Sequence, residues 1–126
     1  MTELTQDVPG RHLFIRSIDE QGIRVGDQHF TRSLLISPEV LIDDWPPQSL
    51  AELGPGHFSA ILELEPELVL LGTGAKQAFL RPEQLATFYR RQIGIELMST
   101  EAACRTFNVL VGEGRKAVAA LLPPQA

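Results

Sequence analysis

A glycine-rich turn that follows an apolar run is the part of the sequence best suited to bind a ligand. The run from Leu68 to Leu71 has no alternation of apolar and polar residues, which predicts a strand buried on both faces. Gly72, Thr73 and Gly74 come next, and Lys76 lies two residues further on. Glycines permit a sharp turn and leave backbone N–H groups free to face an anion, to which Lys76 would add a positive charge. The turn is therefore the candidate ligand-binding site.

The residues after the turn do not complete a nucleotide-binding motif. Gln77 stands where the third glycine of Gly-x-Gly-x-x-Gly would be. The next helix is predicted to begin at Pro82, too late for its N-terminus to face the turn. The spacing also differs from Gly-x-x-x-x-Gly-Lys-Ser/Thr. A tight structural turn is the preferred interpretation, and we expect no cofactor.

No other group of residues has the spacing of a catalytic or metal-binding site. The histidines lie far apart, and none has a second ligand three or four residues away. They are His12, His29 and His57. Cys104 is the single cysteine, and its place beside alanines in a predicted helix favours a buried apolar role over a nucleophile. We therefore expect no metal site and no catalytic residue, and we lean toward a protein that is not an enzyme.

Two polar residues in the C-terminal part carry further information. Asn108 is a weak helix former among apolar neighbours, so we expect its amide to satisfy backbone groups or to meet a ligand. Arg115 follows Gly114 at the predicted end of a helix. There a cation can bond the last helical carbonyls, which is the preferred interpretation, or act as a second cationic group of the ligand site.

The composition indicates one acidic domain. The 126 residues, 44% of them hydrophobic, are enough for a single core, and we expect one domain over residues 1–126 with a flexible N-terminus at 1–10. A net charge of −5 disfavours nucleic acid as a partner. The N-terminus lacks the pattern of a secretory or organelle signal, and no apolar run approaches the roughly 20 residues that span a bilayer. The expected protein is soluble and cytoplasmic, without membrane insertion.

The first third of the chain predicts antiparallel β-structure. Short strand-like runs over residues 14–18, 23–25, 28–31, 33–36 and 40–42 are separated by clusters of turn-forming residues. Asp43 to Pro47 then predicts a loop, because its two prolines each lack a backbone donor. Trp45 in this loop either covers the core, which is preferred, or contacts a partner.

From residue 68 onward, strands and helices alternate. After a helix over 57–65, the pattern predicts strands over 68–71, 95–98 and 117–122 and helices over 82–93 and from 100 to Gly112 or Gly114. This alternation implies right-handed crossovers and parallel pairing. The predicted fold class is α/β: a single domain with a mixed central sheet, a C-terminal βαβαβ unit with helices packed on the sheet, and an N-terminal antiparallel β part.

Four segments together resemble a widespread family of small domains of largely unassigned function. They are residues 69–74, 104–110, 113–115 and 119–124. The positions that match the family pattern are Gly72, Thr73, Gly74, Phe107, Asn108, Gly114 and Arg115. The family includes assembly factor 3 of mitochondrial respiratory complex I and an adipogenesis-associated domain protein. The resemblance implies a compact α/β domain with a mixed sheet and offers no agreed catalytic residue or cofactor.

Two functions remain open at this point. The resemblance and the lack of a catalytic constellation favour a non-enzymatic protein-binding or assembly module. The alternative is a small-molecule or anion-binding domain, possibly an enzyme, centred on the Gly72-Thr73-Gly74 turn with Lys76 and Arg115. A turn closed by side chains would favour the module, and a pocket lined by free N–H groups would favour the binding domain. The absence of a transit-like leader favours a bacterial or cytosolic relative of the mitochondrial protein.

Overall fold

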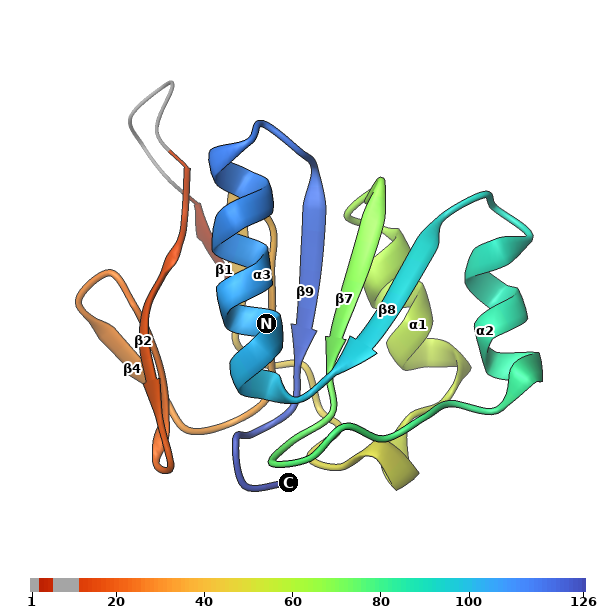
Figure 1. Ribbon diagram of the computed structural model, residues 1–126, viewed down its shortest axis with the longest axis horizontal. Coiled ribbons are helices and arrows are strands. Elements are labelled where there is room, and N and C mark those ends of the chain that lie inside the picture. The colour runs from red at the N-terminus through yellow and green to blue at the C-terminus, as the bar shows by residue number, and fades with distance from the viewer. Residues whose placement is uncertain (1–2, 6–11) are drawn as a thin grey trace.

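A computed structural model describes residues 3–5 and 12–126, and side chains from residue 12 onward. Its main element is a six-stranded mixed sheet with the strand order β1-β6-β5-β9-β7-β8 (Figure 1). These strands are β1 (Glu3–Thr5), β5 (Leu34–Ile36), β6 (Val40–Ile42), β7 (Leu68–Gly72), β8 (Gly94–Met98) and β9 (Ala117–Leu121). A separate antiparallel sheet is formed by β2 (Ile15–Asp19), β3 (Gly22–Val25) and β4 (Gln28–Phe30).

In the described part of the chain, three α-helices and one short 3-10 helix complete the fold. They are η1 (Leu50–Glu52), α1 (Pro55–Leu62), α2 (Pro82–Tyr89) and α3 (Thr100–Gly112). Helix α2 ends earlier than the predicted position near 93. The chain turns after Tyr89 because Gln92 adopts a left-handed φ of 61° and donates its N–H to the Tyr89 carbonyl.

The C-terminal half forms the predicted parallel unit. Strand β7 pairs in parallel with both β8 and β9, placing Leu68 beside Gly94 and Ala117 and Gly72 beside Met98 and Leu121. Strands β1, β6 and β5 continue the sheet in antiparallel pairing. The structure confirms the predicted α/β class, with its mixed sheet, its βαβαβ unit and its antiparallel N-terminal part.

Alternate residues of the central strands supply two hydrophobic cores, one on each face of the large sheet. In β9, Ala117, Ala119 and Leu121 pack with helix α3 and the small sheet, whereas Val118 and Ala120 pack with α1 and α2. Both faces of β9 are thus covered, which explains its uninterrupted apolar sequence. The helices hold β7 and its glycine turn in a buried position.

Residues 1–2 and 6–10 of the stretch predicted to be flexible lie outside the described residues, and residues 3–5 form β1, which pairs with β6.

The loop predicted at Asp43 to Pro47 is present in the structure. Trp45 in this loop is buried in the core and donates its indole N–H to the His57 carbonyl at 3.2 Å. The core role preferred for Trp45 is confirmed.

Candidate functional site

The glycine turn follows β7 at the carboxyl edge of the parallel unit. Its backbone N–H groups donate within the protein: Thr73 to the Met98 carbonyl at 2.8 Å and Gly74 to Thr100 Oγ1 at 2.9 Å. The next N–H, that of Ala75, donates to the Ala126 carbonyl oxygen at 3.1 Å. These three N–H groups already have partners, so an anion would have to displace those partners to bind them.

The Thr73 side chain closes the loop that follows. Its buried hydroxyl contacts the carbonyl oxygens of Lys76 at 2.7 Å and Met98 at 3.1 Å, and accepts the N–H of Ala78 at 3.1 Å. Lys76 is exposed. The Thr73 hydroxyl therefore connects the turn to the end of β8 and to the loop that follows the turn.

Thr100, the first residue of α3, joins the turn to the end of β9. Its Oγ1 accepts the Gly74 N–H and donates to the Leu122 carbonyl at 2.9 Å, while its own N–H donates to the Gly74 carbonyl at 2.8 Å. A Cβ on Gly72 would lie 2.9 Å from Thr100 Cα, so only glycine permits this approach. From the sequence, Thr100 was expected only to lie at the start of a helix. Its partners lie 26 and 22 residues away, and no local pattern announces them.

Residues 123–126 cover the turn from the other side. The segment after β9 returns beside the loop that follows β7 (Figure 1). Gly74 adopts a φ of +107°, and a Cβ there would lie 2.1 Å from the Ala126 carbonyl oxygen. The glycine is required both by this backbone conformation and by the close approach.

A cavity of about 580 Å³ adjoins the turn. Gly74 and Ala75 form part of its lining, together with the acidic side chains of Asp19, Glu20 and Glu101. Neither Lys76 nor Arg115 lines it. Three carboxylates at its wall make this cavity electrostatically unfavourable for the anionic ligand that a glycine turn with lysine suggests.

Arg115 lies at the opposite end of the sheet from the turn. It precedes Ala117, which pairs with Leu68 at the start of β7, whereas Gly72 pairs with Leu121 at the other end. Its backbone N–H donates to the Leu110 carbonyl at 2.9 Å, and Gly114, with a φ of +78°, allows the chain to turn there. The helix end is thus capped by the backbone of Arg115, while the side chain is exposed. The structure does not bring Arg115 and Lys76 together.

Asn108 binds the backbone of the small sheet. Its Oδ1 accepts the Ile15 N–H at 2.7 Å, and its Nδ2 donates to the Ile15 carbonyl at 2.7 Å. The side-chain amide thus pairs with β2 as a neighbouring strand would, and it fastens that strand to α3. Of the two roles that the sequence left open, the structure shows the satisfaction of backbone groups. Phe107, the preceding matched position, is fully buried in the core.

We expect Asn108→Ala to lower the free energy of unfolding by about 1–3 kcal/mol, because two partly buried hydrogen bonds to Ile15 are lost. Urea denaturation measures this loss. Val109→Ala is the matched control, since Val109 is exposed on the same helix and its truncation should change stability by no more than about 0.5 kcal/mol. Equal stability of the two variants would contradict the role assigned to Asn108.

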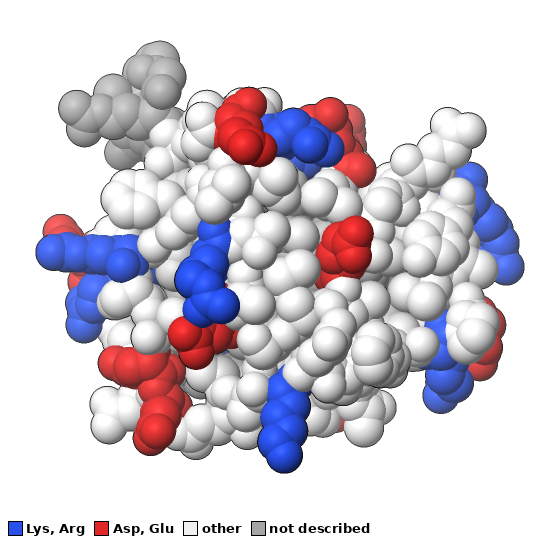
Figure 2. All heavy atoms as spheres, viewed as in Figure 1, with Lys and Arg blue, Asp and Glu red and all other residues white. Residues whose placement is uncertain are grey.

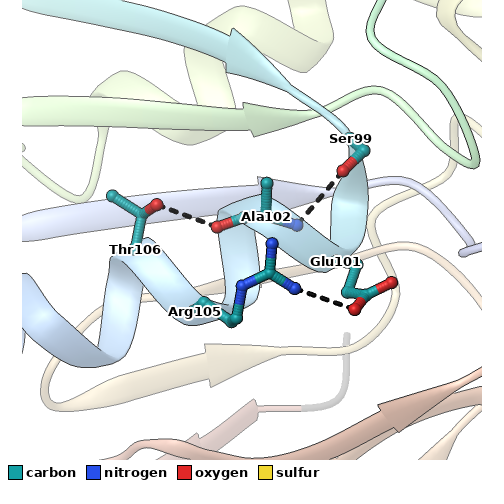
Figure 3. Close-up of polar contacts among 5 residues, drawn as sticks. All are labelled: Ser99, Glu101, Ala102, Arg105 and Thr106. Atoms are coloured by element: carbon teal, nitrogen blue, oxygen red, sulfur yellow. Dashed lines mark hydrogen bonds and ion pairs between the residues drawn. The ribbon is translucent and has the colours of Figure 1, made fainter.

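The start of α3 is fixed by local contacts (Figure 3). Ser99 accepts the Ala102 N–H at 3.2 Å as the N-cap, and Thr106 donates to the Ala102 carbonyl at 2.8 Å. Arg105 pairs with Glu101 at 2.8 Å on the exposed side. These contacts stabilise the helix whose first residue, Thr100, holds the turn.

Cys104 and His57, which were considered as candidate site residues from the sequence, have structural roles. Cys104 is 2% exposed, and burial raises the pKa of its thiol from 9.0 to about 12, so the thiol stays protonated at neutral pH. His57 accepts the Gly54 N–H through Nδ1 at 3.0 Å. Within residues 3–5 and 12–126, no three His, Cys, Asp or Glu side chains are grouped so as to hold a metal ion. In the same part of the chain, no helix has the length and hydrophobicity needed to cross a membrane.

Comparison with known proteins places the chain among relatives of similar fold. It is 33% identical over 114 residues to the mouse protein named NADH dehydrogenase [ubiquinone] 1 alpha subcomplex assembly factor 3, covering 89% of this chain and 61% of that one. The chain thus spans less than two thirds of that relative. A crystal structure from Bordetella parapertussis matches with a TM-score of 0.86 at 33% identity, covering 92% and 99% of the two chains. An NMR structure from Xanthomonas campestris matches with a TM-score of 0.82 at 38% identity, covering 96% and 92%.

The family assignment agrees with the resemblance found in the sequence. The family model described as "Protein of unknown function (DUF498/DUF598)" matches residues 15–122, from the first strand of the small sheet to the residue after β9. The matched range includes the glycine turn, Asn108 and Arg115. This chain therefore belongs to the DUF498/DUF598 family, which has members named as complex I assembly factors.

Proposed function

We propose that this protein is a non-enzymatic protein-binding module that acts in the assembly of a multisubunit complex. The observation that carries the proposal is the closed glycine turn. The N–H groups of Thr73, Gly74 and Ala75 donate to protein acceptors, which is the geometry expected of a structural turn. The mouse relative's name supports an assembly role.

Exposed apolar side chains give the module surfaces on which to bind a protein. Among the side chains from residue 12 onward, four large apolar ones are more than half exposed: Phe14, Phe79, Tyr89 and Val109. Aromatic side chains are enriched in the buried parts of protein interfaces. Figure 2 shows a face whose middle is largely uncharged, with most charged side chains nearer its rim. We further propose that the protein acts in the cytoplasm, which the single buried Cys104 supports.

Crosslinking and affinity purification of the tagged full chain from its native host test the proposed function. We expect one or a few proteins to be recovered specifically and repeatedly, compared with a tagged unrelated protein. A Phe14→Asp, Val109→Asp double variant and a Phe79→Asp, Tyr89→Asp double variant show which exposed pair is needed for recovery. Failure to recover any specific protein under several crosslinking conditions would contradict the proposal.

The alternative function is a small-molecule or anion-binding domain centred on Gly72, Thr73, Gly74 and Lys76, without Arg115, which lies at the opposite end of the sheet. The cavity beside Gly74 is the observation that favours it, and the carboxylates of Asp19, Glu20 and Glu101 at its wall favour a neutral or cationic molecule there over an anion. A melting screen with nucleotides and with anionic, neutral and cationic metabolites distinguishes the two functions, since a ligand at about a hundred times its dissociation constant adds roughly 2.7 kcal/mol to stability. A specific thermal shift, abolished by Lys76→Ala, would favour the alternative.

A further inference from the structure

Strand β8 ends the large sheet, because β7 is its only neighbouring strand in the described part of the chain. In a parallel pair, successive residues direct their N–H and C=O groups alternately toward and away from the neighbouring strand. The Met98 carbonyl accepts the Thr73 N–H, so the backbone N–H and C=O groups of Met98 and Glu96 are directed toward β7. Ile95 and Leu97 therefore direct their backbone groups away from the sheet.

Within the described residues, one of these outward groups has a hydrogen-bond partner. The Leu97 carbonyl accepts the side-chain amide of Gln77 at 2.9 Å. Within the described residues, the Ile95 N–H, the Ile95 carbonyl and the Leu97 N–H have no hydrogen-bond partner. Three adjacent backbone groups are thus unpaired within the described residues, as on an edge strand that a further strand can join, and the fourth is paired only with the Gln77 side chain.

The two sides of β8 differ in character. The side chains of Ile95 and Leu97 pack into the core shared with α2, which holds the strand in place. Glu96 points to the opposite side and is exposed. A strand added beside β8 would therefore meet apolar surroundings on one side and a carboxylate on the other.

We propose that the β8 edge binds an extended segment of a partner protein as an additional strand, with a lysine or arginine opposite Glu96. This rests on the proposed protein-binding function and names the surface and the chemistry of the partner. Residues directly opposite in neighbouring strands have Cβ atoms about 4.5–5.5 Å apart, so a basic residue there would pair with the carboxylate. Phe79 and Tyr89, both strongly exposed, belong to the β7–β8 crossover and add apolar surface to this half of the molecule.

A second copy of the chain fits the edge less well. An antiparallel β8–β8 pair that uses the outward groups of Ile95 and Leu97 in both copies would place Glu96 directly opposite Glu96. Like charges in that position are destabilising, and each chain already carries a net charge of −5. Glu96 therefore acts against self-association while favouring a basic segment, a common means of controlling exposed sheet edges.

Leu97→Pro tests the edge, because proline removes the outward N–H of residue 97 while the N–H groups that face β7 stay in place. Leu97→Ala is the matched control, since it shortens the same side chain and keeps the N–H. The probe is a short end-blocked peptide of alternating valine and lysine, observed by NMR. We expect shifts and slowed hydrogen exchange at the Ile95 and Leu97 amides, with affinity for Leu97→Pro at least about tenfold below that for Leu97→Ala.

Charge reversal provides a test that does not depend on proline. Glu96→Lys should bind an alternating valine and glutamate peptide better than the lysine peptide, reversing the preference of the natural chain. Equal binding of the lysine peptide to Leu97→Pro and Leu97→Ala, or shifts away from β8, would overturn the proposal. Protection of the same amides together with a doubled mass, in the absence of peptide, would also overturn it and identify a second copy as the occupant.

The outcome separates this proposal from the proposed function. If both Leu97 variants recover the same partner from the host equally well, the partner binds elsewhere, and the edge proposal is wrong while the assembly function stands. If neither the natural chain nor any variant recovers a partner from the host, the proposed assembly function is contradicted, whether or not the peptide binds at β8.

Discussion

Replacing Thr100 with valine is expected to lower the free energy of unfolding by about 2–6 kcal/mol, although the two side chains have nearly the same shape. The Thr100 side chain is fully buried, and its hydroxyl accepts the Gly74 N–H and donates to the Leu122 carbonyl. Valine leaves both backbone groups buried without a partner, and each such group costs about 1–3 kcal/mol. Urea denaturation measures the loss, and faster hydrogen exchange at Gly74 locates it.

Thr100→Ser is the matched control for this prediction. Serine keeps the hydroxyl and removes one methyl group, so it should lose only about 1 kcal/mol. Stability of Thr100→Val equal to or above that of Thr100→Ser would show that the hydroxyl contributes little. It would also remove the main reason for concluding that the hydrogen bonds of the turn stabilise the fold.

The bonding of the turn decides which function the site supports. A glycine turn that binds an anion needs N–H groups that face solvent. Here the N–H groups of Thr73, Gly74 and Ala75 reach β8, α3 and residue 126. These bonds hold together segments that are distant in sequence, so the turn contributes to stability. This favours a function at the outer surface over one at the turn.

Local sequence patterns were sufficient to predict most of the fold. The uninterrupted apolar runs at β7 and β9 indicated strands buried on both faces, and each strand is covered on both faces by core residues. Turn-forming residues and prolines marked most of the element ends. Where the prediction failed, as at the end of α2, the cause was a left-handed residue, Gln92, that is not a glycine. A glutamine does not by itself predict a left-handed conformation.

The surroundings of the candidate site were beyond local patterns. The groups that close the turn come from Thr100 and Ala126, and Asn108 binds Ile15 across 93 residues of sequence. Such partners depend on which strands lie side by side, and topology is known only once the chain is folded. The sequence could therefore predict that the chain turns at the glycines. It could not predict that the N–H groups of the turn donate hydrogen bonds to other parts of the protein. The edge position of β8 was missed for the same reason.

Gly74→Ala is expected to lower the free energy of unfolding by about 2–5 kcal/mol through two separate effects. A φ of +107° is strained for a residue with a side chain, at about 1–3 kcal/mol. The new Cβ would also lie 2.1 Å from the Ala126 carbonyl oxygen and 2.7 Å from its carbon, so residues 123–126 must move away. That movement breaks the bond from the Ala75 N–H to Ala126. Urea denaturation gives the total loss, and hydrogen exchange at Ala75 reports the displacement.

Gly114→Ala separates the two effects. Gly114 also has a positive φ, +78°, but a Cβ there would meet nothing within 4 Å. Its substitution should therefore carry the backbone strain alone and cost about 1–2 kcal/mol. A larger loss for Gly74→Ala, with faster exchange at Ala75, would show that residues 123–126 press on the turn. Equal losses with no change at Ala75 would mean that this segment leaves the turn readily, and the closed turn that carries the assembly proposal would then be open to a ligand.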